Sequence, residues 1–205
     1  MKGVTAFSES DIFAVSRVLA LHRLADRNMA LFTLGIETGF RITELLSLTV
    51  SDVYKDGCVL ETVSVARRNM KRKREGRSIP LTKRARAAVS EYLTALTDQG
   101  YWQAGDYLFQ SSRKGNAPIS RSQAWQVIHD AARAAGISKR IGTHSMRKTF
   151  ARRYRDWLLE QMAVHRRQIE PMREVQKALG HKSIESTERY IEWDASILTE
   201  YIQTR

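Results

Sequence analysis

Apolar residues recur at helical spacing along most of the chain. Ile12, Val15 and Leu19 share one face of a predicted helix, and Ser8 followed by Asp11 is typical of its start. A serine hydroxyl can cap free N–H groups there, and an early acid suits the helix dipole. The same spacing predicts further helices over residues 26–38, 43–46, 83–97, 122–135, 144–167, 172–179, 184–191 and 195–203.

One stretch between the helices changes its period. Residues 58–66 are rich in β-branched residues and roughly alternate, and they follow the turn residues Asp56 and Gly57. This pattern predicts a strand after a tight turn. Residues 78–81 predict a returning edge strand, because Pro80 has no N–H group to donate to a ladder. The expected fold class is therefore mainly α with a small antiparallel β-sheet (α+β).

The excess of basic residues in the composition indicates what kind of partner the chain binds. The 205 residues include 34 Lys and Arg against 22 Asp and Glu, a net charge of +12. Such an excess predicts a polyanionic partner, most simply nucleic acid, with an anionic membrane surface as the alternative. No apolar run is long enough for a transmembrane helix, and the N-terminus has no signal-peptide core. Cys58 is the only cysteine, which excludes a disulfide scaffold.

Half of the net charge lies in one short segment. Residues 67–77 hold seven basic residues and one acid, a net charge of +6. A solvated surface loop is the plain interpretation of such a run. Seven cations in eleven residues repel one another, and a phosphate backbone would neutralise them. With the flanking strands, the segment predicts a hairpin with a cationic tip.

Common catalytic motifs do not occur in the sequence. There is no His-Glu-x-x-His helix motif, no Gly-x-x-x-x-Gly-Lys-Ser/Thr phosphate loop and no Gly-x-Ser-x-Gly elbow. The sequence therefore predicts no metal site and no cofactor.

Three short passages still suggest chemistry. Arg41 follows Gly39, which is expected to end the preceding helix in a left-handed conformation. An arginine in apolar surroundings needs an anion, either Glu44 one turn later or a bound phosphate.

The other two passages lie near the C-terminus. His144 and Arg147 share one helix face. The plain interpretation is that His144 caps the helix and Arg147 is a surface charge. The alternative is that His144 handles a proton and Arg147 binds a phosphate. His181 follows Gly180 in a predicted turn, and Tyr190 comes nine residues later. A tyrosine tethered in the core is the plain interpretation of Tyr190.

In this order, the passages resemble the tyrosine recombinase/phage integrase family. Residues 39–45 are similar to its first arginine box, residues 143–151 to its second and residues 179–190 to its third. The hairpin that ends at residues 77–81 is similar as well. The resemblance covers nearly the whole chain. It implies a tyrosine recombinase catalytic-domain-like fold, with residues 1–205 as a single catalytic domain.

The family resemblance also implies roles for individual residues. Tyr190 would attack a scissile phosphodiester, giving a 3′-phosphotyrosine link and a free 5′-hydroxyl. Arg41 and Arg147 would bind the non-bridging oxygens, and His181 would donate a hydrogen bond to the same phosphate. His144 would act as a base toward the tyrosine or as a positioning donor.

A hairpin lysine protonates the 5′-oxygen in this family. Lys71 is favoured here because it is nearer the end of the first strand, with Lys73 as the alternative general acid. The other cations of the segment and one neighbour of the second box are expected to hold the DNA backbone: Arg67, Arg68, Arg72, Lys73, Arg74, Arg77 and Lys148.

Two features depart from common family members. The chain begins close to the first box, so the sequence predicts no N-terminal core-binding domain in it. The interval between Arg147 and His181 is long and predicts an extended amphipathic helix, with Trp157, Leu158 and Met162 against the core. Contact of this helix with DNA or with a neighbouring protomer is the alternative.

The resemblance implies a site-specific DNA recombinase that uses neither metal nor ATP, for integration, excision, inversion or dimer resolution. Its partner is double-stranded DNA, and a homotetramer is expected on DNA, compatible with a monomer in solution. The tail of residues 193–202 would pack on its own core or dock on the next subunit.

A cytoplasmic, nucleoid-associated protein encoded by a bacterium, phage or plasmid is expected, with no membrane partner. The alternatives are a type IB topoisomerase-like or hairpin-resolving strand transferase, and a non-catalytic DNA-binding relative.

Overall fold

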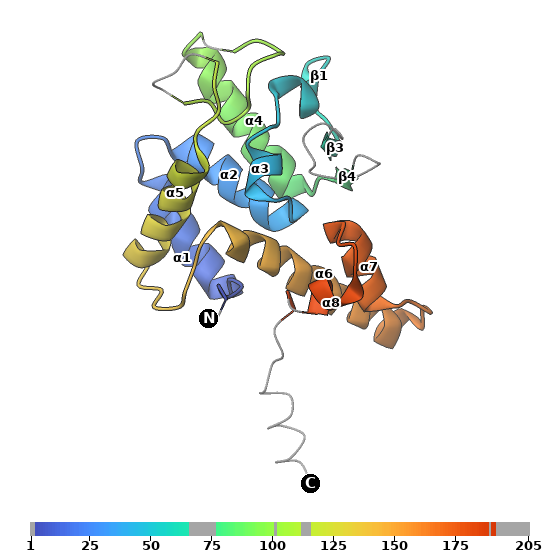
Figure 1. The fold of residues 1–205 in the computed structure, drawn as a ribbon. Helices are drawn as coiled ribbons and strands as arrows, with labels where there is room; N and C mark the ends of the chain where they lie inside the picture. Colours follow the sequence, from blue (N-terminus) through green and yellow to red (C-terminus); the bar gives the residue numbers. More distant parts are fainter. Residues whose placement is uncertain (1–2, 66–76, 101, 112–115, 189, 192–205) are drawn as a thin grey trace. The chain divides into compact units, whose positions relative to one another are not determined.

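The computed structural model describes residues 3–65, 77–100, 102–111, 116–188 and 190–191. The chain divides into two compact units, Met1–Phe150 and Ala151–Arg205, and the boundary falls within one helix (Figure 1). None of the described helices is both long and apolar enough to span a membrane. The predicted hairpin tip and the predicted helix over 195–203 lie outside the described residues.

The first unit contains α1 (Glu9–Ala20), α2 (Ala25–Thr38), α3 (Ile42–Leu45), α4 (Lys83–Asp98), α5 (Arg121–Ala134) and the start of α6 (Thr143–His165), with a 3-10 turn at Val50–Asp52. Of these helices, α1, α4 and α5 begin after a hydroxyl cap, at Ser8, Thr82 and Ser120. The Ser8 hydroxyl accepts a hydrogen bond from the Asp11 N–H at 3.1 Å, and the Asp11 carboxylate accepts one from the Ser8 N–H at 2.8 Å. Thr82 caps α4 in the same way. These contacts confirm the predicted starts of α1 and α4.

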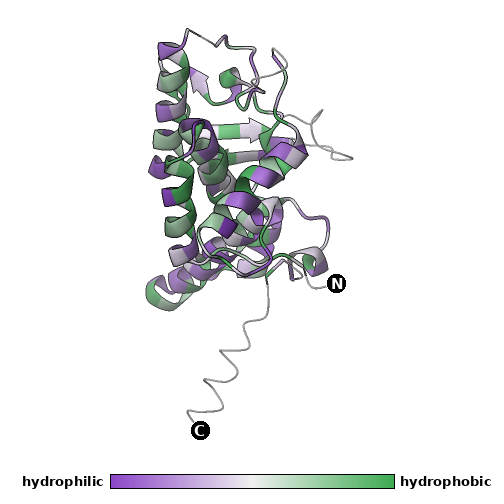
Figure 2. Ribbon diagram, turned by 90° about the vertical axis from the view of Figure 1, so that its left-hand side faces the viewer, coloured by the Kyte–Doolittle hydropathy of each residue, from purple (hydrophilic) through white to green (hydrophobic). Residues whose placement is uncertain are grey.

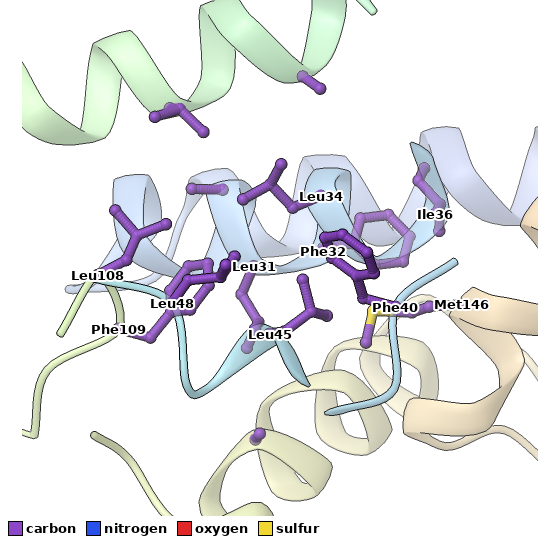
Figure 3. Packing of buried hydrophobic residues seen from close by; sticks show 14 of the residues in the cluster. Leu31, Phe32, Leu34, Ile36, Phe40, Leu45, Leu48, Leu108, Phe109 and Met146 are labelled. Atoms are coloured by element: carbon purple, nitrogen blue, oxygen red, sulfur yellow. The ribbon is translucent and has the colours of Figure 1, made fainter. Parts of the chain in front are cut away.

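Helix α2 is the centre of the first unit. Its residues 30–36 are all buried, as expected for a helix with neighbours on every side. Figure 3 shows Leu31, Phe32 and Leu34 among Leu45, Leu108 and other side chains from separate parts of the unit. Along the helices, hydrophilic and hydrophobic residues alternate, as expected of amphipathic elements (Figure 2). Burial of this apolar surface is the main force that holds the unit together.

Two small antiparallel sheets replace the single predicted sheet. Strands β1 (Tyr54–Lys55) and β2 (Cys58–Val59) pair around the expected turn, and β3 (Thr62–Val65) pairs with β4 (Arg77–Pro80). The prediction of one strand over 58–66 was therefore wrong. The Leu60 N–H donates to the Val53 carbonyl, whereas the Glu61 carbonyl accepts from Leu81. Because these backbone groups bond to different segments, the ladder breaks between β2 and β3.

The second unit contains the rest of α6, followed by α7 (Pro171–Leu179) and α8 (Ile184–Glu188). Leu158 is buried as predicted, but Trp157 and Met162 are 48% and 36% exposed, so their predicted core packing was wrong. The helix predicted over 184–191 also ends early, at Glu188. Helical spacing shows which residues share a face and does not show whether a partner covers that face.

Gly39 tests the packing where α2 ends. Its φ of 61° is left-handed, and a Cβ atom there would lie 2.4 Å from Cδ1 of Phe150. We expect Gly39→Ala to lower the free energy of unfolding by about 2–3 kcal/mol, from backbone strain plus the clash. Urea denaturation measures this change.

Gly136→Ala is the matched control, because Gly136 has a φ of 75° and open space around its Cα. This variant carries the backbone strain alone and is expected to cost about 1 kcal/mol. Equal losses in the two variants would contradict the close approach of Phe150.

Candidate active site

Arg41 stands between the left-handed turn at Gly39 and the start of α3. Its backbone N–H donates to Oε2 of Glu44 at 2.7 Å, and its Nη1 donates to Oε1 of Glu44 at 2.9 Å. The Arg41 side chain is 37% exposed, whereas that of Glu44 is almost fully buried. The carboxylate therefore holds Arg41 from inside the unit while part of the guanidinium faces solvent.

A second arginine reaches the same carboxylate. Nη2 of Arg77, on β4, donates to Oε2 of Glu44 at 3.1 Å. Burial raises the pKa of the Glu44 carboxyl, but the charge of Arg77 and the hydrogen bonds from Arg41 outweigh it. The net effect holds the pKa of Glu44 below its ordinary value, so this group stays an anion at neutral pH.

Arg147 connects the second predicted box to the first. It lies in the first two turns of α6, is only 1% exposed and donates from Nη1 to the Gly39 carbonyl at 2.5 Å. Residues 108 positions apart in the chain are thereby joined. This bond places the Arg147 guanidinium close to the turn that carries Arg41.

His144 precedes Arg147 by one helical turn and keeps an exposed side chain. Partial desolvation lowers the pKa of His144, and the charges of Arg147, Arg41 and Lys148 lower it further. The imidazole is therefore neutral near pH 7 and can accept a proton. The first unit thus assembles three of the predicted residues, Arg41, His144 and Arg147, into one cation-rich site.

The second unit brings the other two predicted residues together. Gly180 ends α7 in a left-handed conformation with φ of 61°, and the chain turns directly into His181. Nδ1 of His181 and the buried Thr187 hydroxyl share a hydrogen bond of 3.0 Å. The Tyr190 N–H donates to the Thr187 carbonyl at 2.9 Å. The rings of His181 and Tyr190 consequently lie 5.0 Å apart between centroids.

Tyr190 differs from its predicted place in one respect. It follows the last residue of α8 instead of lying within the helix. Its backbone is still tied to α8 through the Thr187 carbonyl.

The predicted lysines and most of the predicted DNA contacts lie outside the described residues: Arg67, Arg68, Lys71, Arg72, Lys73 and Arg74. Arg77 and Lys148 are described, and they are only 8% and 9% exposed. Their burial gives no support to a role on the DNA backbone, so that role stays a prediction. Within the described ranges, no three His, Cys, Asp or Glu side chains gather in a way that would hold a metal ion.

Sequence reasoning missed Thr187, and it assigned Arg77 to the DNA backbone instead of to a buried contact within the site. Thr187 carries no signal, because a threonine on a short helix is common. Arg77 carries a weak one, since strand alternation puts it on the same face as Ile79, which is the buried face of β4. Glu44 was recognised as a partner for Arg41, and its contact with Arg77 was not foreseen.

Comparison with known proteins connects this arrangement to a family. Residues 7–196 match the model of the phage integrase family. A probable integrase/recombinase, YoeC, of Bacillus subtilis is 30% identical over 165 residues, which are 80% of this chain and 77% of the relative. The tyrosine recombinase XerD of Corynebacterium glutamicum is 33% identical over 174 residues, 85% of this chain and 51% of the relative. The chain therefore spans about half the length of XerD.

Solved structures show the same fold. The XerA recombinase superposes with a TM-score of 0.72 at 25% identity, covering 100% of this chain and 66% of that protein. The XerH recombinase bound to its difH substrate superposes with a TM-score of 0.69 at 21% identity, covering 98% of this chain and 53% of that protein. Because residues 7–196 match the family model, the chain belongs to the phage integrase family.

Proposed function

We propose that this chain is the catalytic part of a site-specific DNA recombinase, which cleaves and rejoins DNA through a 3′-phosphotyrosine without metal or ATP. The observation that carries the proposal is the contact between the rings of His181 and Tyr190, 5.0 Å apart between centroids. It supports the proposal because the imidazole that we propose to bind phosphate lies beside the hydroxyl that we propose to attack it. The family match and the DNA-bound XerH structure support DNA as the substrate.

The cleavage step includes two proton transfers, one from the attacking hydroxyl and one to the leaving 5′-oxygen. The Tyr190 oxygen forms a bond to phosphorus as its proton passes to a base, and neutral His144 suits that task. The bond from phosphorus to the 5′-oxygen breaks, and that oxygen takes a proton from a lysine. Reversal by another 5′-hydroxyl releases the tyrosine and reseals a strand, because the phosphotyrosine preserves the bond energy.

The arginines supply the electrostatic part of catalysis. Charge on the non-bridging oxygens is stabilised best by donors that are already in place. A guanidinium has five N–H donors, so Arg41 can keep its bond to Glu44 and present other donors to a phosphate. Arg147 is anchored to the Gly39 carbonyl and is positioned in the same way.

The decisive variant is Tyr190→Phe. The 205-residue chain is incubated with a nicked suicide duplex selected by binding from random-sequence DNA, and the products are separated on a denaturing gel. We expect a covalent protein–DNA adduct with the wild-type chain and none with Tyr190→Phe, because only the hydroxyl is removed.

Tyr154→Phe is the matched control, since Tyr154 lies on α6 and stacks with Trp157. This variant should form the adduct as the wild type does. An adduct that survives in Tyr190→Phe contradicts the proposal. Relaxation of a supercoiled plasmid without any recombination site would indicate a topoisomerase-like enzyme.

The general acid is tested by changing the leaving group. Lys71→Ala is expected to slow cleavage by about 10²-fold or more, and a 5′-bridging sulfur should restore the rate, since a thiolate leaves without a proton. Lys73→Ala serves as the comparison and is expected to respond weakly. Rescue of Lys73→Ala alone would move the role to that residue, and rescue of neither excludes both lysines.

We also propose that the chain assembles as a homotetramer on DNA and works in the cytoplasm on nucleoid DNA. The amphipathic pattern of residues 193–202 supports docking of the tail on a neighbouring subunit. Truncation after Asp194 is expected to abolish cooperative assembly in a gel-shift titration while leaving single-site binding within about twofold. Undiminished cooperativity would contradict docking in trans.

A further inference from the structure

Arg77 occupies an unusual place for a cation. It pairs with Val65 in the ladder between β3 and β4 and shares the buried face of β4 with Ile79. A charge in such surroundings is costly unless a partner compensates it. Its burial therefore calls for a role within the protein.

Glu44 and Phe40 both contact the Arg77 guanidinium. Nη2 donates to Oε2 of Glu44 at 3.1 Å, and Cζ lies 4.5 Å from the centroid of the Phe40 ring. Burial lowers the pKa of Arg77 to about 10, while the charge of Glu44 opposes that shift. Arg77 therefore remains a cation at neutral pH, fixed by a charged hydrogen bond on one side and an aromatic face on the other.

The carboxylate that Arg77 holds is the one that holds Arg41. Oε2 of Glu44 accepts from Arg77 and from the Arg41 backbone, while Oε1 accepts from the Arg41 side chain. Rotation of the carboxylate would break contacts with both arginines. A side chain locked in this way keeps the group it supports in a fixed geometry.

The position of Arg77 in the chain adds a second connection. Arg77 is the first residue of β4 and follows directly on the segment 66–76, which carries Lys71 and Lys73. The contact with Glu44 therefore ties the residue that follows the lysine-bearing segment to the arginine box.

We propose that Arg77 is a positioning residue for Arg41, acting through Glu44, and not one of the cations that hold the DNA backbone. The inference rests on the proposed function, in which Arg41 binds the scissile phosphate. It assigns the buried cation at the start of β4 to the reaction itself.

Kinetics distinguish the two roles of Arg77. In single-turnover cleavage of the selected suicide duplex, Arg77→Met is expected to slow cleavage at saturating DNA by about tenfold or more. DNA affinity and its salt dependence should stay as in the wild type. A backbone-contacting cation would give the opposite result, with weaker binding, a salt slope smaller by about one and normal cleavage at saturation. That result overturns the proposal.

The pH profile tests the connection through Glu44. The charged groups that act on the Glu44 carboxyl are Arg77 and Arg41. On α6 the titratable group is His144, which feels the charges of Arg147, Arg41 and Lys148. Arg77 lowers the pKa of Glu44, so its removal raises that pKa and the carboxyl is protonated at higher pH. The acid limb of cleavage should therefore move to higher pH in Arg77→Met. In a His144→Ala background, where the proposed base no longer contributes to the acid limb, an unmoved limb contradicts the proposal.

Further variants complete the kinetic test. Arg77→Lys keeps the charge and should restore much of the acid limb, whereas Arg77→Gln removes the charge and replaces Arg77→Met should that variant fail to fold. In a Glu44→Gln background, Arg77→Met should add little, because both changes act on one contact. Additive losses contradict action through Glu44. Arg86→Met is the matched control, and this variant should cleave as the wild type does. Arg86 lies on α4, and its Nη1 is 3.6 Å from Oε1 of the exposed Glu61.

A readout without DNA separates this inference from the proposed function. Titration of the Glu44 carboxyl by ¹³C NMR should show a higher pKa in Arg77→Met than in the wild-type chain. An equal pKa in the two proteins overturns the role of Arg77. A wild-type chain that forms no adduct contradicts the proposed function instead, and the NMR comparison still decides whether Arg77 acts on Glu44.

Discussion

The buried carboxylate of Glu44 is the contact on which the first unit's site depends. It accepts from the backbone and side chain of Arg41 and from the guanidinium of Arg77. One anion thereby sets the direction of the arginine proposed to bind phosphate. The left-handed turn at Gly39 contributes the other fixed point, because its carbonyl accepts from Arg147. Two arginines from distant parts of the chain are preorganised by groups that do not themselves react, which is how a protein stabilises charge without reorganising at the moment of reaction.

In the second unit, contacts between residues close in the sequence hold the predicted site residues. A left-handed Gly180 stops α7 and directs the chain into His181. The buried Thr187 then bonds to the His181 ring through its hydroxyl and to the Tyr190 backbone through its carbonyl. The predicted nucleophile and its neighbouring imidazole are thus held by one short helix. A histidine and a tyrosine nine residues apart in the sequence are thereby brought into contact.

Features determined by local chemistry were predictable from the sequence, and features determined by distant partners were not. The start of α1 at Ser8 and the end of α2 at Gly39 follow from capping and from backbone freedom. The break between β2 and β3 arises because the Leu60 N–H donates to the Val53 carbonyl. The alternation of apolar and polar residues along the sequence does not reveal this contact. The exposure of Trp157 was not predictable for a similar reason, because helical spacing does not show whether another element covers that face of the helix. The site residues were predicted by resemblance of motifs, whereas the burial of Arg77 required the structure.

In the proposed reaction, the phenolic oxygen of Tyr190 carries the DNA strand. Mass spectrometry of the covalent adduct, after digestion of both protein and DNA, is the sharpest test of this role. We expect a peptide in which Tyr190 bears a nucleotide through the nucleotide's 3′-phosphate. A nucleotide on any other residue, or one attached through a 5′-phosphate, would contradict it.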